Sequence, residues 1–165
     1  MTITDAIQTF RAVRRFTEAP LQDDTVRAIL NAGRRAQSSK NTQAWLFIAV
    51  RNRDTLQQLA GCGPYARHLA GAALGVALVA PAENPFDLGQ AAAYMMLRAW
   101  ELGVGSCIAS MYDQDKARAV LGVPEDHVFR TAISFGYPLP GEQRPPGLVP
   151  GGRRPFDEVV RWEHF

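Results

Sequence analysis

The chain has 165 residues, of which 47% are apolar, and this size and composition predict one packed domain spanning residues 1–165. Its 18 basic and 16 acidic residues give a formal net charge of +2, which is too small a field to hold nucleic acid along an extended surface. A small-molecule partner is expected instead.

Cysteine usage and hydropathy indicate the compartment. Cys62 and Cys107 lack both a CxxC spacing and the density of a secreted disulfide framework, so a reducing, cytoplasmic location is expected. The N-terminal residues carry no apolar run of the signal-peptide kind. The apolar stretch 69–81 is too short to cross a bilayer, so no membrane partner is predicted.

Predicted helices and strands alternate along the chain. Helices are expected from Thr4, over 23–37, from Asp54 to Gly61, over 87–102, where Gly103 ends the helix, and over 113–121. Strands are expected over 45–50, 72–80, 106–109 and 128–135. The runs 45–50 and 72–80 are continuously apolar, which predicts interior strands covered on both faces.

The last part of the chain differs in composition. Residues 138–150 are rich in Pro and Gly, which predicts an extended arm over the surface. The arm leads to an apolar, aromatic tail that includes Phe156, Trp162 and Phe165. A tail of this kind is expected to be buried against another surface.

The first cluster with possible chemistry is basic. Arg11, Arg14 and Arg15 lie within five positions, and on a helix they would share one face on which an anion could bind. The alternative interpretation is a solvated basic surface, with Phe10 and Phe16 in the core.

The second cluster is a polar loop between a predicted helix and a predicted strand. It contains Ser38, Ser39, Asn41 and Gln43, whose hydroxyl and amide groups could bind the polar rim of a ligand. An ordinary polar turn is the alternative.

The third cluster lies far along the chain. Gly151 and Gly152 would permit close approach of a ligand to the backbone, and Arg153 and Arg154 could complete a phosphate site. A flexible basic terminus is the alternative interpretation.

Other motifs are excluded. Residues 61–66 fit the pattern G-x-G-x-x-A, but they follow a predicted helix and contain Pro64, which a dinucleotide-binding turn does not tolerate. His68, His127 and His164 lack metal-ligand spacing, and no Ser/His/Asp set is apparent, so no metal site is expected. An enzyme with this sequence would depend on a bound organic cofactor.

Taken in order, the three clusters resemble the nitroreductase family of FMN-dependent oxidoreductases. Residues 11–16 are similar to the opening Arg-rich motif of the family, and residues 38–45 to its Ser, Asn and Gln-Trp motif. The segment 87–107 resembles its central helix and the loop after it, and residues 153–156 resemble its C-terminal signature. The resemblance covers essentially the whole chain.

The resemblance implies an α+β fold with a central mixed β-sheet flanked by helices. It implies a homodimer with FMN at the subunit interface, in which a C-terminal arm, residues 138–165, reaches the partner subunit. The implied reaction is hydride transfer from NAD(P)H through flavin N5 to a small electrophilic acceptor, such as a nitroaromatic or a quinone, in a ping-pong cycle. No side chain is expected to act as a nucleophile.

Roles for individual residues follow from the same resemblance. Arg11, with Arg153 or Arg154, is expected to bind the phosphate, and Arg14 is expected beside the pyrimidine edge of the isoalloxazine, where a cation favours hydride acceptance. The expected cofactor-binding residues are Arg11, Ala12, Val13, Arg14, Arg15, Ser38, Ser39, Asn41, Gln43, Ala109, Ser110, Arg153 and Arg154. Ser39 and Asn41 would contact the ribityl chain or ring edge, and backbone groups near Ala109 would face N5.

Three alternatives remain open. The chain could be a flavin-binding or flavin-storing protein without significant turnover. It could be a specialised relative, such as a reductive dehalogenase or a flavin-fragmenting enzyme. It could also be a small basic anion-binding module whose arginines lie on the surface.

Overall fold

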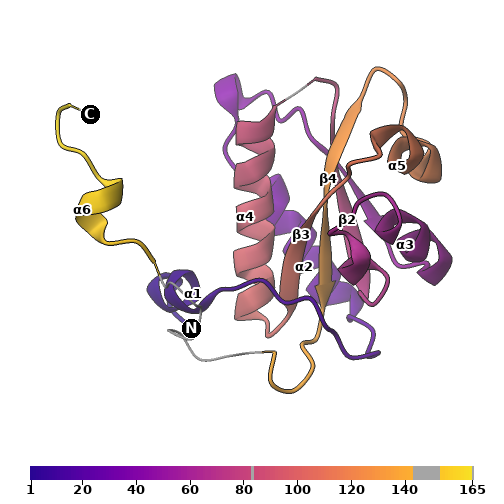
Figure 1. The fold of residues 1–165 in the computed structure, drawn as a ribbon, viewed down its shortest axis with the longest axis horizontal. Coiled ribbons are helices and arrows are strands. Elements are labelled where there is room, and N and C mark those ends of the chain that lie inside the picture. Colours follow the sequence, from indigo (N-terminus) through magenta and orange to yellow (C-terminus); the bar gives the residue numbers. More distant parts are fainter. Residues whose placement is uncertain (83, 143–152, 165) are drawn as a thin grey trace.

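The computed structural model describes residues 1–82, 84–142 and 153–164, in which helices cover both faces of one sheet (Figure 1). The helices are α1 (Ile3–Thr9), α2 (Asp23–Arg34), α3 (Arg53–Ala60), α4 (Pro85–Glu101), α5 (Gln114–Leu121) and α6 (Phe156–Val159), with the short 3₁₀ helices η1 (Ser39–Asn41) and η2 (Arg67–Leu69). The strands are β1 (Leu46–Val50), β2 (Leu74–Ala80), β3 (Gly105–Ser110) and β4 (Val128–Gly136).

The four strands pair in the order β1-β2-β4-β3, and each pair is antiparallel. β2 lies inside the sheet with every residue buried, as its apolar run predicts. The prediction of an interior strand at 45–50 is wrong, because β1 is an edge strand and its Leu46 is 56% exposed. An apolar run indicates burial, and it does not show how many neighbours a strand pairs with.

The α+β class predicted from the sequence is confirmed. Within the described residues, the parallel component of the sheet is a single bridge between Ala12 and Ser106. This bridge joins the segment after α1 to the outer edge of β3, where the parallel geometry brings residues 10–16 alongside the sheet.

Two apolar cores lie on opposite faces of the sheet. On one face, α2 and α4 place Ile29 and Met95 against Leu78 of β2. On the other face, α3 and α5 pack with Ala77 and Val79 of the same strand. Side chains alternate along a strand, so β2 contributes apolar residues to both cores. Helices therefore pack on both faces of the sheet.

The helix ends follow capping rules. α1 begins with a reciprocal capping box between Thr2 and Asp5. α4 is capped by Asn84, whose side chain accepts a hydrogen bond from the Asp87 N–H. α4 ends before Gly103, which has a φ of 75°. The sequence therefore locates the end of the central helix correctly.

Residues 10–16 are extended, so the helical face on which Arg11, Arg14 and Arg15 would have met does not form. α1 ends at Thr9, and the Val13 N–H then donates to the Ser106 carbonyl at 2.9 Å. Gly105 allows this contact, because a Cβ at that position would lie 2.6 Å from the Cβ of Val13. Hydrogen bonds to the edge of β3 replace the local bonds of a helix.

Residues 143–152 of the predicted C-terminal arm, which include Gly151 and Gly152, lie outside the described residues. Before that gap, the Leu139 N–H donates to the Arg15 carbonyl at 3.1 Å. After it, α6 stands apart from the sheet and its helices (Figure 1), and Phe156 and Trp162 are 62% and 75% exposed. Among the described residues, no helix has the length and apolar character needed to cross a bilayer.

Replacing Gly105 with alanine is expected to loosen the attachment of residues 10–16 to β3. Over-packing of this kind costs about 1–3 kcal/mol, so the urea midpoint of unfolding should fall. Gly71→Ala is the matched control, because nothing lies within 4 Å of a Cβ at that position. Equal midpoints for the two variants would contradict the close packing of Val13 on Gly105.

Candidate functional site

An open hollow of about 510 Å³ lies beside the outer edge of β3. Its lining residues are Arg14, Tyr65, Arg67, His68 and Ile108, and we refer to it as the cationic hollow. The extended segment after α1 supplies Arg14, the turn at η2 supplies Arg67 and His68, and β3 supplies Ile108. Three segments far apart in the sequence therefore meet at this site.

His68 is the buried polar group of the hollow, with only 8% of its surface exposed. Its Nδ1 lies 2.7 Å from Ser134 Oγ, and that hydroxyl donates to the Cys107 carbonyl at 3.3 Å. A serine hydroxyl has one proton, and with that proton directed to the Cys107 carbonyl we assign Nδ1 as the donor to Ser134. This tautomer leaves Nε2 unprotonated, and Nε2 has no hydrogen-bond partner among the described residues.

Burial lowers the pKa of His68, and the neighbouring Arg14 guanidinium lowers it further, while the Ile108 backbone opposes the shift. Burial also raises the pKa of the Cys107 thiol, an effect that Arg14 partly offsets. Both groups are therefore uncharged near neutral pH, and the positive charge of the hollow comes from its arginines.

The three arginines of the first cluster do not share one face. Arg14 lines the cationic hollow, whereas Arg15 forms an ion pair with Glu142, with 2.6 Å between Nη2 and Oε1. Arg11 is half-buried, and its Nε donates to the Thr9 carbonyl at 3.3 Å. A helix would place these three arginines on one face. Successive side chains of an extended backbone point to opposite sides instead, so no such face forms.

Ala12 and Val13, between these arginines, have different environments. Ala12 is exposed at the bridge to β3, and Val13 is fully buried, where it packs with Phe16 and Ala72. Val13 therefore anchors the segment through the core, while Ala12 stays at the surface beside Arg14.

The polar loop of the second cluster is fastened to the beginning of α4. The Ser39 N–H donates to Asp87 Oδ2 at 3.1 Å, and the Gln43 N–H donates to Ser38 Oγ at 3.0 Å. Lys40, Asn41 and Gln43 have φ angles of 51°, 54° and 49°. Left-handed backbone in residues other than glycine is strained and is concentrated at functional sites, which supports a binding role for this loop.

The first two clusters lie at opposite ends of α4. Ser39 contacts Asp87 in its first turn, whereas the Trp100 Nε1 in its last turn donates to Thr9 Oγ1 at 2.9 Å. With a rise of 1.5 Å per residue, these ends are about 20 Å apart along the helix axis. The loop residues do not line the cationic hollow, so one copy of the chain does not bring the two clusters together.

The remaining expected residues lie on β3 and in the tail. Ala109 is fully buried, and Ser110, the last residue of β3, is exposed. Arg153 and Arg154 are exposed, and Arg154 Nε lies 4.0 Å from Glu158 Oε2 within the tail itself. The tail arginines and the cationic hollow are thus separate groups in the described chain.

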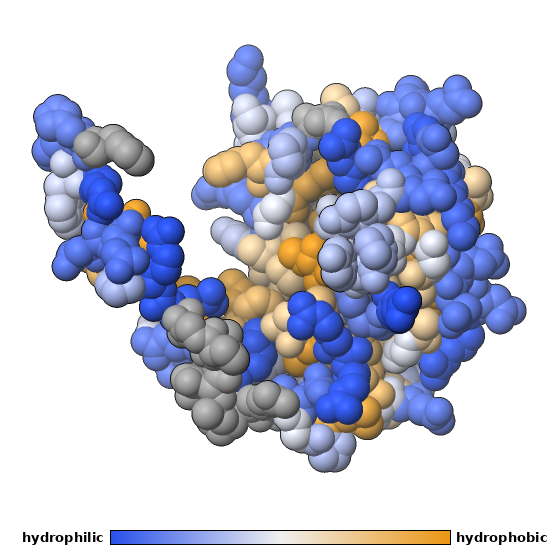
Figure 2. All heavy atoms as spheres, in the orientation of Figure 1, coloured by the Kyte–Doolittle hydropathy of each residue, from blue (hydrophilic) through white to orange (hydrophobic). Residues whose placement is uncertain are grey.

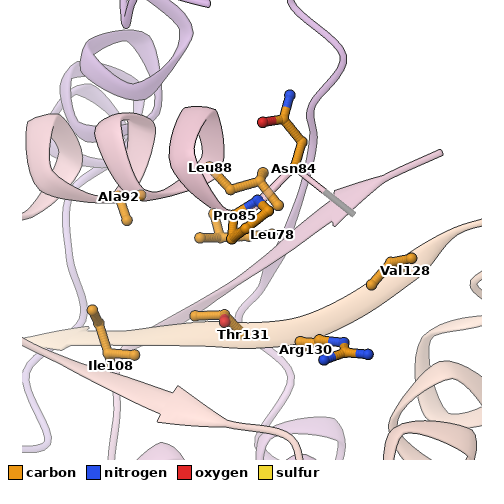
Figure 3. A pocket seen from close by; sticks show the side chains of 10 residues that line it. Leu78, Asn84, Pro85, Leu88, Ala92, Ile108, Val128, Arg130 and Thr131 are labelled. Carbon is orange, nitrogen blue, oxygen red and sulfur yellow. The ribbon is translucent and has the colours of Figure 1, made fainter. Parts of the chain in front are cut away.

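A second cavity of about 330 Å³ adjoins the cationic hollow at Ile108, which is 48% exposed (Figure 3). The N-terminal half of α4 forms one wall with Leu88 and Ala92, and β4 forms the opposite wall with Thr131 and Arg130. The walls are mostly apolar. The site therefore joins a cationic region to an apolar region of a size suited to a small ligand.

Sequence reasoning missed Tyr65, Arg67, His68 and Ile108. Residues 61–66 were rejected as a dinucleotide fingerprint, which agrees with their position directly after α3. No local pattern marks η2 as part of a site, because its position depends on packing against β3 and β4. No group of residues suited to holding a metal ion occurs in the described ranges.

The comparison with known families decides the identity. The sequence model of the nitroreductase family matches residues 7–78 and 65–137, which together cover well over half of the chain. The chain belongs to the nitroreductase family.

Individual members of the nitroreductase family align over nearly the same length. A relative from Archaeoglobus fulgidus, provisionally named NADH dehydrogenase/NAD(P)H nitroreductase, is 29% identical over 144 residues, which cover 80% of this chain and 83% of the relative. The solved structure of an FMN-dependent nitroreductase from Clostridium difficile R20291 has a TM-score of 0.83 and 25% identity, covering 99% of this chain and 100% of that chain.

A third relative shares the fold. It is the NADPH:FMN oxidoreductase from Vibrio harveyi, solved in complex with NAD⁺, with a TM-score of 0.85 and 21% identity over 98% of this chain and 77% of that chain. The described architecture is therefore that of a nitroreductase.

His68 is expected to make this nitroreductase less stable in acid. Its pKa in the folded chain lies below the ordinary histidine value of about 6.5, so the unfolded chain binds more protons as the pH falls through that value. Stability should therefore decrease below about pH 6.5. Urea midpoints measured at about pH 7.5 and 5.5 should differ more for the wild type than for His68→Gln.

His164→Gln is the matched control for this measurement, because His164 is exposed and lies outside the hollow. This variant should show the same difference between the two midpoints as the wild type. The same dependence in wild type and His68→Gln would show that His68 does not titrate with folding.

Proposed function

We propose that this nitroreductase is an FMN-dependent oxidoreductase that takes hydride from NAD(P)H and reduces a small electrophilic acceptor. The observation that carries the proposal is the cationic hollow, in which Arg14 lies beside the buried His68. The printed names of the relatives, which include an FMN-dependent nitroreductase and an NADPH:FMN oxidoreductase, support the same chemistry.

The residues of the hollow fit FMN. Arg14 and Arg67 suit an anionic ligand, and the half-exposed side chain of Ile108 suits the face of a flat ring. The buried Nε2 of His68 is an unsatisfied polar atom at the same place, and such atoms in a folded protein indicate an additional group nearby.

When bound, FMN supplies the N5 atom that accepts and donates hydride, so the chain itself needs no nucleophile. Arg14 would place a fixed positive charge beside the ring edge on which negative charge accumulates. Arg11, with Arg153 or Arg154, would hold the phosphate, and backbone groups near Ser110 would lie toward N5. Donor and acceptor would use the same open face in turn, which predicts ping-pong kinetics.

The adjoining apolar cavity suggests where the acceptor binds. Its volume of about 330 Å³ lies within the range that small-molecule sites occupy, and its lining is mostly apolar. A small aromatic acceptor, such as a nitroaromatic or a quinone, would fit such a cavity next to Ile108 and would leave the cationic hollow to the cofactor.

We infer that a second copy of the chain completes the site. The loop at Ser39 contacts the first turn of α4, and Thr9, just before the segment with Arg11, contacts its last turn, about 20 Å away along the helix axis, so the two clusters lie at different ends of the helix within one copy. In a symmetric dimer, the loop of the partner subunit could reach the cationic hollow of the first. Each of two equivalent sites would then use both clusters.

The surface supports a dimer as well. Ile3 and Ile7 of α1 and Tyr94 of α4 are exposed and line one shallow depression. Figure 2 shows apolar surface along the α4 side of the body, facing the tail that carries Phe156 and Trp162. Exposed apolar surface of this extent is typical of an interface.

The two arginines have distinct expected roles. Arg11→Ala removes a charge-assisted contact to phosphate, worth about 1.5–3 kcal/mol, and should weaken FMN binding roughly tenfold or more in a fluorescence titration. Arg14→Gln should instead slow the reduction of bound FMN by NAD(P)H more than it weakens binding, as measured by stopped-flow absorbance at saturating FMN.

Arg51→Gln is the matched control for both measurements, because Arg51 is paired with Asp23 and does not line the hollow. It should bind and reduce FMN like the wild type. Wild-type affinity in Arg11→Ala would reject the phosphate role, and a wild-type reduction rate in Arg14→Gln would reject the electrostatic role.

Truncation after Pro150 should abolish dimerisation and FMN binding together, because the tail carries both its exposed aromatic residues and Arg153 and Arg154. Burial of the exposed aromatic side chains of the tail, such as Phe156 and Trp162, against a second subunit contributes several kcal/mol at about 25 cal/mol per Å² of apolar area. Light scattering and flavin absorbance on the same sample test this. A truncated chain that remains a yellow dimer would show that the first 150 residues build the site alone.

A further inference from the structure

The proton on His68 is fixed by the hydrogen bonds beneath the cationic hollow. Ser134 Oγ donates to the Cys107 carbonyl and therefore accepts from Nδ1 of His68. The remaining nitrogen, Nε2, carries a lone pair and meets no donor among the described residues. The imidazole is therefore held so that one identified atom, Nε2, can accept a proton.

The groups around His68 decide when that proton is accepted. Arg14, from the segment after α1, and Arg67, from η2, are the charged residues of the hollow, and both are cations. Tyr65, just before η2, and Ile108, on β3, complete the lining, and burial raises the pKa of the Cys107 thiol on the same strand. No carboxylate is present in the lining given by the described residues, so a protonated imidazole would add a further positive charge.

We propose that Nε2 of His68 takes up one proton when the flavin bound in the cationic hollow gains negative charge, and releases it when that charge leaves. This inference rests on the proposed function. The burial and cationic surroundings that keep the imidazole neutral are opposed by an anion in the hollow, which favours the charged form of a nearby histidine.

The electrons and protons of the cycle balance. NAD(P)H delivers two electrons and one proton as hydride and leaves as NAD(P)⁺, so one negative charge is added within the hollow. Water supplies the second proton, which is held at Nε2 of His68. When the acceptor takes the hydride, the proton leaves Nε2 and completes the two-electron, two-proton reduction of the acceptor. His68 thus acts on the charge of the cofactor and does not touch the transferred hydride.

The test is to count protons during the reduction of FMN-loaded protein. The protein is mixed anaerobically with NADH at about pH 7.5 in weak buffer with an indicator dye, and the flavin absorbance is recorded together with the dye. The wild type should take up close to one proton per flavin reduced. His68→Gln should take up almost none, and His127→Gln, altered at a surface histidine, should behave as the wild type.

The possible outcomes distinguish a failure of the His68 role from a failure of the proposed function. Bleaching of the flavin without proton uptake in the wild type, or with equal uptake in His68→Gln, overturns the role of His68 alone. Absence of bleaching with both NADH and NADPH contradicts the proposed function and, with it, this inference.

A second measurement needs no variant. The chain has three histidines, so proton NMR can follow the ring signal of each one through a pH titration of the FMN-loaded protein, before and after anaerobic reduction. The His68 pKa should rise by roughly two units or more on reduction, because uptake of close to one proton at pH 7.5 requires a shift of that size, and the titration curves of His127 and His164 should be the same before and after reduction. An unchanged His68 pKa would overturn the proposal.

Discussion

The hydrogen bond from the Val13 N–H to the Ser106 carbonyl is the constraint on which the site depends. It holds the segment after α1 against the outer edge of β3, and the absence of a side chain at Gly105 allows Val13 to approach closely enough to form it. Once Val13 is buried, the next residue, Arg14, is directed to the surface beside His68. A backbone contact thus sets the position of the Arg14 charge.

The same packing explains why the site has two kinds of surface. The polar groups under the hollow, from His68 through Ser134 to the Cys107 carbonyl, lie on a chain of hydrogen bonds that crosses from η2 to β4 and β3. The apolar cavity beyond Ile108 lies instead against the first half of α4. A flat cofactor with one charged edge needs both surfaces, because its ring is apolar and its pyrimidine edge carries the charge.

Sequence patterns predict those parts of the fold whose causes are local. β2 follows from its apolar run, and the end of α4 follows from Gly103. The arginine spacing in the segment 10–16 is compatible with a helical face, and the residues that make the segment extended, Ser106 and Pro138, are far away in the sequence. The status of β1 as an edge strand also depends on pairing that a single strand does not encode.

The site also contains residues that the sequence indicates and residues that only the fold brings together. Arg14 and the loop at Ser39 belong to motifs with a recognisable composition, so the sequence predicts them as candidates. In the sequence His68 is an isolated histidine, because its partners Ser134 and Arg14 approach it only in the folded chain. Sequence spacing also could not show that α4 separates the first two clusters, and this separation is the strongest structural argument for a second subunit.

The proposed function is tested most directly by adding FMN to the cofactor-free protein and then adding NADH or NADPH without oxygen, while the visible flavin spectrum is recorded. We expect saturation at one FMN per chain, followed by complete bleaching with at least one of the two nicotinamides. Failure to bind FMN, or a bound flavin that neither nicotinamide reduces, would contradict it.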